Sequence, residues 1–395
     1  MSRKKNHWTP TPSQELLLKS AWSEPRHAFP CWEQWRKSND IEKLDQGSYR
    51  LLPLVFKNLG NQIPFEDEWH EKLKGTLRKS WFSNNMIQAT AAVLFSELKK
   101  LGIRPLLLKG LHLINAYYDD MAARPLGDAD FLVSWEQVAA VDGYLRSSGW
   151  KPKAKPRLAA GGENSMSSGN GINYVNEKGY ACDLHWNVMA HRCYPDADKK
   201  MITNAVNIAF EGDCFRALCP EDLILHLLEH GAYGNPIPSI RWVPDVLMVL
   251  KKEEAIDWDR FLAHTLQTNL EVPVKAMLAY LLNSFSAEKV AYPVKKLAGL
   301  PAAKMGKVVY RNMLPGRTAI GRSMCEYRKI YFRYQLFMTE HKKESRPRGL
   351  SGWMRCLKFR WNIKSNVLFP IVFMEKFFHK FLPYILGQLK PRQVN

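Results

Sequence analysis

Residues 103–133, IRPLLLKGLHLINAYYDDMAARPLGDADFLV, contain the segments from which the fold of this chain can be predicted. Ile103–Leu108 is a short apolar run between Gly102 and Lys109-Gly110, which is typical of a buried strand followed by a turn. Helical spacing follows in residues 111–120, and a second apolar run covers residues 131–133. We therefore predict a strand, a glycine turn, a helix and a second strand.

The segments on either side extend this pattern. Residues 135–149 have helical periodicity, and residues 172–186 contain two β-like runs around a turn at 176–179, which predicts a hairpin. Residues 151–171 are rich in Pro, Gly and Ser, so we predict a long loop, whether or not it closes over a ligand. We predict helices in residues 13–101 and in the residues beyond Pro220. The expected fold class is α+β, a small mixed sheet flanked by helices.

Composition is consistent with several packed parts. The chain has 395 residues, of which 46% are apolar and 24% charged, so a collagen-like, disordered or disulfide-scaffold protein is excluded. We divide it into a helical N-terminal lobe (1–101), a core (102–215), a helical C-terminal domain (216–303) and a basic, aromatic-rich helical tail (304–395).

The cysteines and the N-terminus predict a cytoplasmic protein. Seven cysteines form an odd set without a C-x-x-C pair, which favours a reduced compartment. The N-terminal sequence MSRKKNHWTPTPSQ lacks the apolar segment of a signal peptide. No run approaches the ~18 apolar residues that a spanning helix requires, so we expect a chain that does not cross a membrane.

Positive charge is concentrated in the tail. The formal net charge is +19, and residues 304–395 hold 20 Lys and Arg against 4 Asp and Glu. Basic and aromatic residues together suit RNA or another polyanion. The segment WNIKSNVLFPIVFMEKFFHKFLPYILGQLK equally suits a helix on an anionic membrane surface, peripheral to its inner face. The third interpretation is a solvated basic face over a helical core.

Three aspartates form the strongest candidate site. Asp128 and Asp130 are two residues apart at the start of a strand, so their carboxylates point to one side. Side by side, such groups repel each other unless a cation lies between them. Asp183 is on a predicted strand that we expect beside the first pair. Three carboxylates from two strands suit a pair of Mg²⁺ ions in phosphoryl or nucleotidyl transfer.

Two neighbouring motifs predict phosphate binding. Lys109-Gly110 lies between a predicted strand and a helix N-terminus, where backbone N–H groups and a cation hold phosphates. Arg124 is a further candidate, because a guanidinium grips phosphate oxygens bidentately. The alternative for Arg124 is an ion pair with the nearby Asp119 or Asp120.

Other polar groups have less specific interpretations. His185 would share a face with Asp183 and either supports the site or packs as an ordinary histidine. The word HLLEH at 226–230 matches a zinc-protease pattern, but that class needs a further acidic ligand downstream, where acids are scarce. Arg241-Trp242 and Asp245 fall between two predicted helices, either lining a cleft or forming a structural ion pair.

The words LLLKGLHLINAYYDDMAARPLGDADFLV, GYACDLHWNV, PEDLILHLLEHGAY and IRWVPDVLMVL resemble a known family. It is the bacterial uncharacterised nucleotidyltransferase family within the DNA polymerase β-like nucleotidyltransferase superfamily. The resemblance covers roughly residues 15 to 300, and its most specific parts are K-G, R-P-x-x-D-x-D followed by apolar residues, and D-L-H-W. The usual turn of the wider superfamily is Gly-Gly or Gly-Ser, whereas this chain has Lys109-Gly110 at the same place.

The resemblance implies a Mg²⁺-dependent nucleotidyltransferase that places a nucleoside monophosphate from an NTP on a hydroxyl acceptor and releases pyrophosphate. Asp128, Asp130 and Asp183 would bind the metal, with Asp183 also helping to activate the hydroxyl. Lys109 and Gly110 would hold the triphosphate. The rival expectation is a non-catalytic binding or scaffold protein with the same fold, and a third is a phosphotransferase. The acceptor, the choice of NTP and the oligomeric state do not follow from the resemblance.

Overall fold

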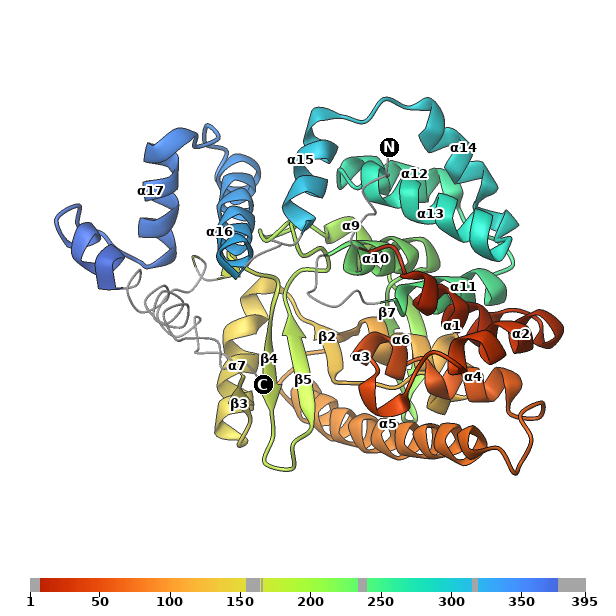
Figure 1. The fold of residues 1–395 in the computed structure, drawn as a ribbon. Helices are drawn as coiled ribbons and strands as arrows, with labels where there is room; N and C mark the ends of the chain where they lie inside the picture. The colour runs from red at the N-terminus through yellow and green to blue at the C-terminus, as the bar shows by residue number, and fades with distance from the viewer. Residues whose placement is uncertain (1–7, 154–163, 165, 234–239, 315–318, 376–395) are drawn as a thin grey trace, which may run out of the picture. The chain divides into compact units, whose positions relative to one another are not determined.

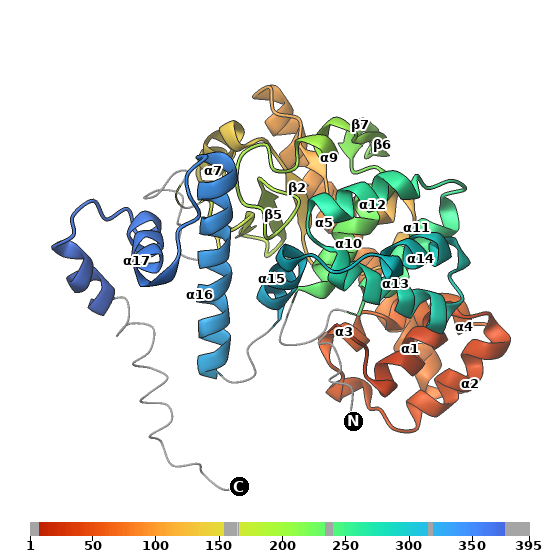
Figure 2. The ribbon, with the colours of Figure 1, turned by 90° about the horizontal axis from the view of Figure 1, so that it is seen from above.

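The computed structural model describes residues 8–153, 164, 166–233, 240–314 and 319–375. It divides into two compact units (Figures 1 and 2). The first unit comprises residues 1–155, 170–190 and 195–315, and the second comprises residues 156–169, 191–194 and 316–395. The four-part division of the chain stays a prediction.

Helices form the N-terminal part of the first unit, as expected from the sequence. Asp67 caps the longest of them by accepting a hydrogen bond from the backbone N–H of Trp69 at 2.9 Å. Acidic residues in its first turn and lysines in its last turn complement the helix dipole. The helices are α1 (Pro12–Trp22), α2 (Pro25–Arg36), α3 (Gln46–Tyr49), α4 (Leu52–Leu59) and α5 (Glu68–Lys100).

A single seven-stranded mixed sheet follows, in the order β3-β4-β5-β2-β1-β7-β6. The β2–β5 and β1–β7 pairs are parallel, and the other neighbours are antiparallel. This architecture is consistent with the α+β class (Figure 1). The strands are β1 (Leu106–Leu107), β2 (Ala129–Leu132), β3 (Lys151–Pro152), β4 (Gly171–Val175), β5 (Ala181–His185), β6 (Val206–Phe210) and β7 (Asp213–Ala217).

The connections show where sequence reasoning fell short. Helix α6 (Lys109–Ala116) begins at the glycine turn itself and ends earlier than predicted. The loop prediction for 151–171 was wrong at its start, which is strand β3, and at its end, where β4 begins, while 154–163 and 165 lie outside the described residues. Strands β6 and β7 were not predicted. Their Glu211-Gly212 turn has φ of +48° and +78°, the left-handed pair that joins tight hairpins.

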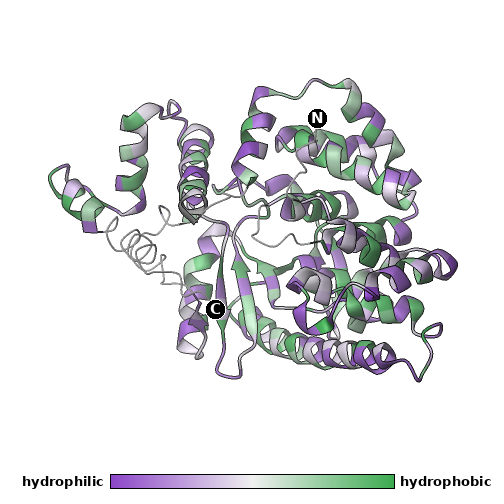
Figure 3. Cartoon of the chain, in the orientation of Figure 1, coloured by the Kyte–Doolittle hydropathy of each residue, from purple (hydrophilic) through white to green (hydrophobic). Residues whose placement is uncertain are grey.

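The core lies between α5 and the sheet. Phe95 of α5 is fully buried, and its ring centroid lies 5.2 Å from Phe131 on β2 and 5.6 Å from Phe215 on β7. Figure 3 shows hydrophobic and hydrophilic residues mixed along α5, as a helix with one buried face requires. Helix α5 therefore fixes the position of the strands that carry the aspartates.

Helices also complete the first unit beyond the sheet. They are α7 (Val138–Ser147), α9 (Lys199–Thr203), α10 (Pro220–Ala232), α11 (Trp242–Lys252), α12 (Trp258–Gln267), α13 (Glu271–Phe285), α14 (Ala291–Gly299) and α15 (Lys304–Met313). In the second unit, α16 (Ala319–Leu336) and α17 (Gly349–Arg360) belong to the predicted tail, whose residues 376–395 lie outside the described part. No helix among the described residues is long and apolar enough to cross a membrane.

Candidate active site

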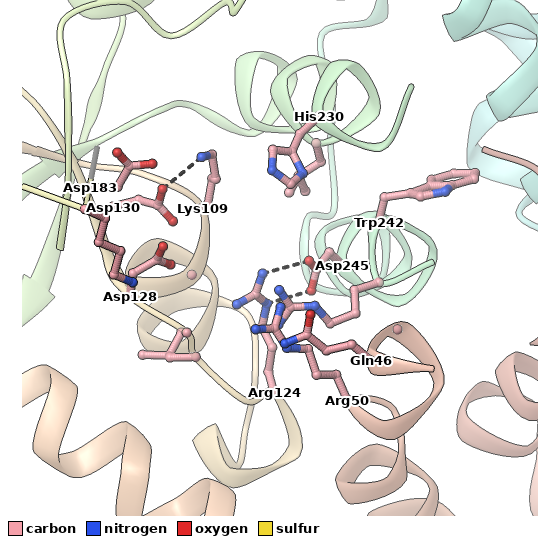
Figure 4. Close-up of a pocket in the computed structure, with 17 residues that line it drawn as sticks. Gln46, Arg50, Lys109, Arg124, Asp128, Asp130, Asp183, His230, Trp242 and Asp245 are labelled. Carbon is pink, nitrogen blue, oxygen red and sulfur yellow. Dashed lines mark hydrogen bonds and ion pairs between the residues drawn. The ribbon is translucent and has the colours of Figure 1, made fainter. Parts of the chain in front are cut away.

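A pocket of about 570 Å³ opens at the ends of β2 and β5, a volume suited to a small-molecule ligand. All six predicted site residues line it, together with side chains from α3, α10 and α11 (Figure 4). The lining residues are Gln46, Gly47, Arg50, Lys109, Gly110, Arg124, Leu126, Gly127, Asp128, Asp130, Lys153, Asp183, Leu227, His230, Arg241, Trp242 and Asp245.

Parallel pairing of β2 with β5 brings the aspartates together. Asp130 lies directly opposite Asp183 in the strand register, as the sequence led us to expect, and Asp128 directly precedes β2. His185 lies two residues after Asp183 on the same face of β5. Its Nε2 atom is 3.1 Å from Asp130 Oδ1 and 3.1 Å from Asp183 Oδ2, so the histidine bridges the two carboxylates.

Lys109 connects the turn to the carboxylates. Its φ of +37° is in the left-handed region, which is uncommon for a residue with a side chain. The Nζ atom lies 2.8 Å from Asp130 Oδ1 and forms an ion pair with it. At Gly110 an added Cβ would lie 2.7 Å from Leu126 Cδ2 and 3.1 Å from Arg124 Nη1. Glycine is therefore required for Arg124 to approach the N-terminus of α6.

The charges of the cluster stabilise one another. Burial alone would lower the pKa of His185, but Asp183 and Asp130 outweigh it and raise the pKa to about 9. Burial would raise the pKa of Asp130, but Lys109 and His185 hold that pKa well below its usual range. Asp128 behaves differently, because burial and repulsion by Asp130 and Asp183 raise its pKa to about 6. Among the three aspartates, Asp128 therefore has the negative charge that neighbouring groups of the protein compensate least.

The same residues fit a divalent metal ion. Ligand atoms of Asp130, Asp183 and His185 lie within 4.8 Å of one another, and they form the one such group of three or more among the described residues. Carboxylate oxygens are the ligands that Mg²⁺ prefers. The raised pKa of Asp128 indicates uncompensated negative charge, which a cation at this place would offset. The donor set therefore supports a metal-binding site here.

Gly171 on β4 leaves the space that His185 occupies. A Cβ at Gly171 would lie 2.9 Å from His185 Nδ1 and 2.9 Å from the carbonyl oxygen of Leu184. We expect Gly171→Ala to lower the free energy of unfolding by about 1–3 kcal/mol through overpacking, measured by urea denaturation. Gly143→Ala on α7 is the matched control. Nothing lies within 4 Å of its added methyl group, so this variant should gain about 0.5–1 kcal/mol. Equal effects of the two substitutions would contradict the argument.

Arg124 has a different partner from those considered in the sequence. Its Nε and Nη2 atoms donate to the two carboxylate oxygens of Asp245 at 2.7 and 2.8 Å, and both side chains are buried. Pairing with Asp119 or Asp120 is therefore wrong, because the exposed Asp119 forms an ion pair with Lys252 and the half-buried Asp120 forms one with Lys57. The reason is topological, since α11 places Asp245 against the turn that follows α6.

The HLLEH segment, residues 226–230, does not form a metal site. The carboxylate of Glu229 accepts a hydrogen bond from the backbone N–H of Ala190 at 2.9 Å. His226 is buried within α10, while His230 faces the pocket (Figure 4). Burial and the Lys109 cation lower the pKa of His226, so this histidine is neutral at physiological pH. The zinc-protease interpretation finds no support in these positions.

Sequence reasoning missed the contribution of the N-terminal helices. Gln46, Gly47 and Arg50 line the pocket from α3 and its C-terminal end. Asp45 caps α3 by accepting a hydrogen bond from the backbone N–H of Ser48 at 3.0 Å. The segment DQGSYR has no motif that marks it as part of a site. Lys153, next to β3, was missed because it falls in the segment predicted as a loop.

Comparison with known proteins gives one family match. A family model described as "Uncharacterised nucleotidyltransferase" matches residues 48–285, more than half of the chain. The matched region begins just before Arg50, includes the whole sheet and ends with α13. No curated protein gives a significant match.

Proposed function

Because the chain belongs to the uncharacterised nucleotidyltransferase family, we propose that it transfers a nucleoside monophosphate from an NTP to a hydroxyl group of an acceptor. The observation that carries this proposal is the placement of Asp130 opposite Asp183, with Asp128 beside them, in one pocket. We further propose that the sheet is of the polymerase β-like type. The strand pairs of β2 with β5 and with β1 support this assignment.

The reaction assigns separate tasks to the pocket residues. The acceptor oxygen attacks the α-phosphorus of the NTP, a P–O bond forms, and the bond to pyrophosphate breaks. Asp183 lies at the pocket wall and accepts the hydroxyl proton in this proposal. Lys109, Gly110 and the N-terminus of α6 hold the phosphates, and the free Nη1 edge of Arg124 faces the same turn.

Two Mg²⁺ ions are the proposed cofactors, held by Asp128, Asp130 and Asp183. When bound, they would supply positive charge to the phosphate oxygens and to the attacking oxygen. His185 positions Asp130 and Asp183 through its two contacts. Lys109 keeps Asp130 ionised and therefore able to bind a cation.

The test is thermal unfolding of the full chain with each of the four NTPs, with and without Mg²⁺. A ligand at 100 times its dissociation constant should stabilise the protein by roughly 2.7 kcal/mol, so the melting temperature rises. We expect a rise that requires Mg²⁺ with at least one NTP. The absence of a rise with every NTP would contradict the proposal and favour the binding or scaffold protein instead.

For the basic tail, we propose an anionic membrane surface as the partner, which would place the protein at the inner face of the membrane. In the second unit, residues 368–375 are helical, and Val367, Leu368, Ile371 and Met374 are all exposed. Exposed apolar side chains beside many Lys and Arg residues favour an anionic lipid surface over a purely charged polymer.

Leu368→Glu/Ile371→Glu should weaken binding to vesicles that contain phosphatidylserine at least about tenfold, because each apolar side chain contributes ~1.5 kcal/mol or more on burial. Sedimentation of the protein with vesicles measures this effect. Val93→Glu on α5 is the control, since Val93 is equally exposed but belongs to the first unit. Unchanged binding by the double variant would mean that the tail is a solvated basic face.

A further inference from the structure

The pocket has a second group of charges apart from the aspartates. Figure 4 shows Arg50 and Arg124 grouped with Asp245, on the other side of the pocket from Asp130 and Asp183. Arg241, at the start of α11, also lines the pocket, and its Nη1 atom donates to the carbonyl oxygen of Pro125 at 2.6 Å. Three guanidinium groups therefore meet one carboxylate at this end.

Four charged side chains of the pocket form two ion pairs with each other, and neither pair includes Arg50 or Arg241. Asp130 forms an ion pair with Lys109, and the two carboxylate oxygens of Asp245 accept hydrogen bonds from Arg124. In the part of the chain that the structure describes, no carboxylate forms an ion pair with Arg50 or Arg241. Burial and the neighbouring Arg124 lower the pKa of Arg50, against the attraction of the Asp128 carboxylate. Burial, Arg124 and Arg50 lower the pKa of Arg241 to about 10. Each of the two arginines is thus a pocket cation that is repelled by Arg124 and has no ion-pair partner among the described residues.

The donor substrate does not balance these charges. In the proposed function, Lys109, Gly110 and the metal ions lie beside the aspartates, so the triphosphate belongs at that end. Two divalent cations and a fully ionised triphosphate carry about equal and opposite charges, and the base and ribose are uncharged. Arg50 and Arg241, which form no ion pair among the described residues, can therefore bind a second anion in the pocket. A guanidinium matches a carboxylate or a phosphate group in geometry as well as in charge.

We propose that Arg50 and Arg241 bind an acidic group of the acceptor, so that the acceptor is an alcohol that also carries a phosphate or carboxylate. This inference rests on the proposed function and specifies its acceptor class. It also gives the N-terminal helices a role, because Arg50 follows α3 and would select the acceptor from outside the sheet.

The test uses inorganic phosphate and acetate as probes, with chloride at equal ionic strength as the reference. Thermal unfolding of the full chain is followed with and without a saturating NTP and Mg²⁺. We expect at least one probe to raise the melting temperature in both conditions. Arg50→Gln and Arg241→Gln should each weaken its binding at least about tenfold, because a hydrogen bond to a charged group contributes ~1.5 kcal/mol or more. The response of these variants to NTP with Mg²⁺ should remain.

Two further variants complete the experiment. Arg78→Gln removes an exposed arginine of α5 that lies outside the pocket and should leave probe binding unchanged. Arg50→Lys keeps the charge without the planar fork and should bind the probe with intermediate affinity. Since Arg50 has no ion-pair partner among the described residues, neither substitution at this position should lower the melting temperature of the ligand-free protein.

Three outcomes are decisive. Equal probe binding by the wild type, Arg50→Gln and Arg241→Gln would overturn the proposal. Competition between probe and NTP, together with loss of the NTP response in both variants, would also overturn it, because the arginines would then bind the donor. Probe binding that depends on Arg50 and Arg241 but no NTP response in any protein would contradict the proposed function alone, and the anion site would stand.

Discussion

Asp130→Asn should abolish the Mg²⁺-dependent response to NTP and reduce nucleotidyl transfer by at least about 10³-fold. Metal ions contribute several kcal/mol to transition-state stabilisation in such reactions, and each 1.36 kcal/mol is a tenfold change in rate. Asp130 is the carboxylate that faces Lys109, Asp183 and His185 at once. Transfer is measured as label from an α-³²P NTP appearing in the acceptor, and binding as the shift in melting temperature.

The control for this variant is Asp213→Asn. Asp213 lies on β7 of the same sheet but is exposed and does not line the site pocket, so both readouts should keep their wild-type values. Labelled product formed by Asp130→Asn at the wild-type rate would contradict the assignment of Asp130 as a metal ligand.

Asp128→Asn should separate the role of the cluster in binding from its role in stability. The folded-state pKa of about 6 exceeds the usual ~3.9 of an aspartate, so the folded protein binds more protons than the unfolded one between these values. Stability therefore falls as pH rises through this window, and the Asp128 charge is destabilising at pH 7. Without Mg²⁺, Asp128→Asn should be more stable than the wild type by on the order of 1 kcal/mol. It should nevertheless lose the Mg²⁺-dependent NTP response.

The second large effect concerns the Arg124–Asp245 pair. Arg124→Met should lower the free energy of unfolding by about 3–5 kcal/mol, because it leaves the buried Asp245 carboxylate without its bidentate partner. The hydroxyl of Tyr118, which donates to Asp245 Oδ1 at 2.8 Å, would be its remaining hydrogen-bond donor among the described side chains. Urea denaturation at pH 7 measures the change.

Two comparisons make this prediction specific. The double variant Arg124→Met/Asp245→Leu should be more stable than Arg124→Met, because no buried charge is then left unpaired. Lys72→Met, which breaks the exposed ion pair with Glu68 on α5, should give no measurable change. If Arg124→Met were as stable as the wild type, the pair would be a surface-like contact rather than a buried one.

Local patterns in the sequence were sufficient to predict the aspartates and the turn. Asp128 and Asp130 directly precede an apolar strand, and Lys109-Gly110 separates a strand from a helix, so spacing alone indicates their place. The position of Asp183 beside them followed from the expectation that its strand joins the same sheet. The first two relations are between near neighbours in the chain, and the third requires only that the two strands belong to one sheet.

The rest of the site depends on contacts that no local pattern encodes. Asp245 meets Arg124 from a helix 121 residues further along the chain, and Arg50 reaches the pocket from the opposite direction. A carboxylate four or five residues before Arg124 was the obvious partner in the sequence, but the packing of α11 places Asp245 there instead. Strand β7 was missed because DCFRA has weak alternation.

The central position of β1 determines when the sheet can close during synthesis. Leu106 pairs with Arg216, about 110 residues later in the chain, so β1 and β2 leave the ribosome roughly 5 to 20 seconds before β7 at typical elongation rates. Until then one edge of β1 has no hydrogen-bonding partner, and open edges recruit other chains. Fragments that stop before residue 213 leave this edge of β1 open permanently and are therefore expected to aggregate.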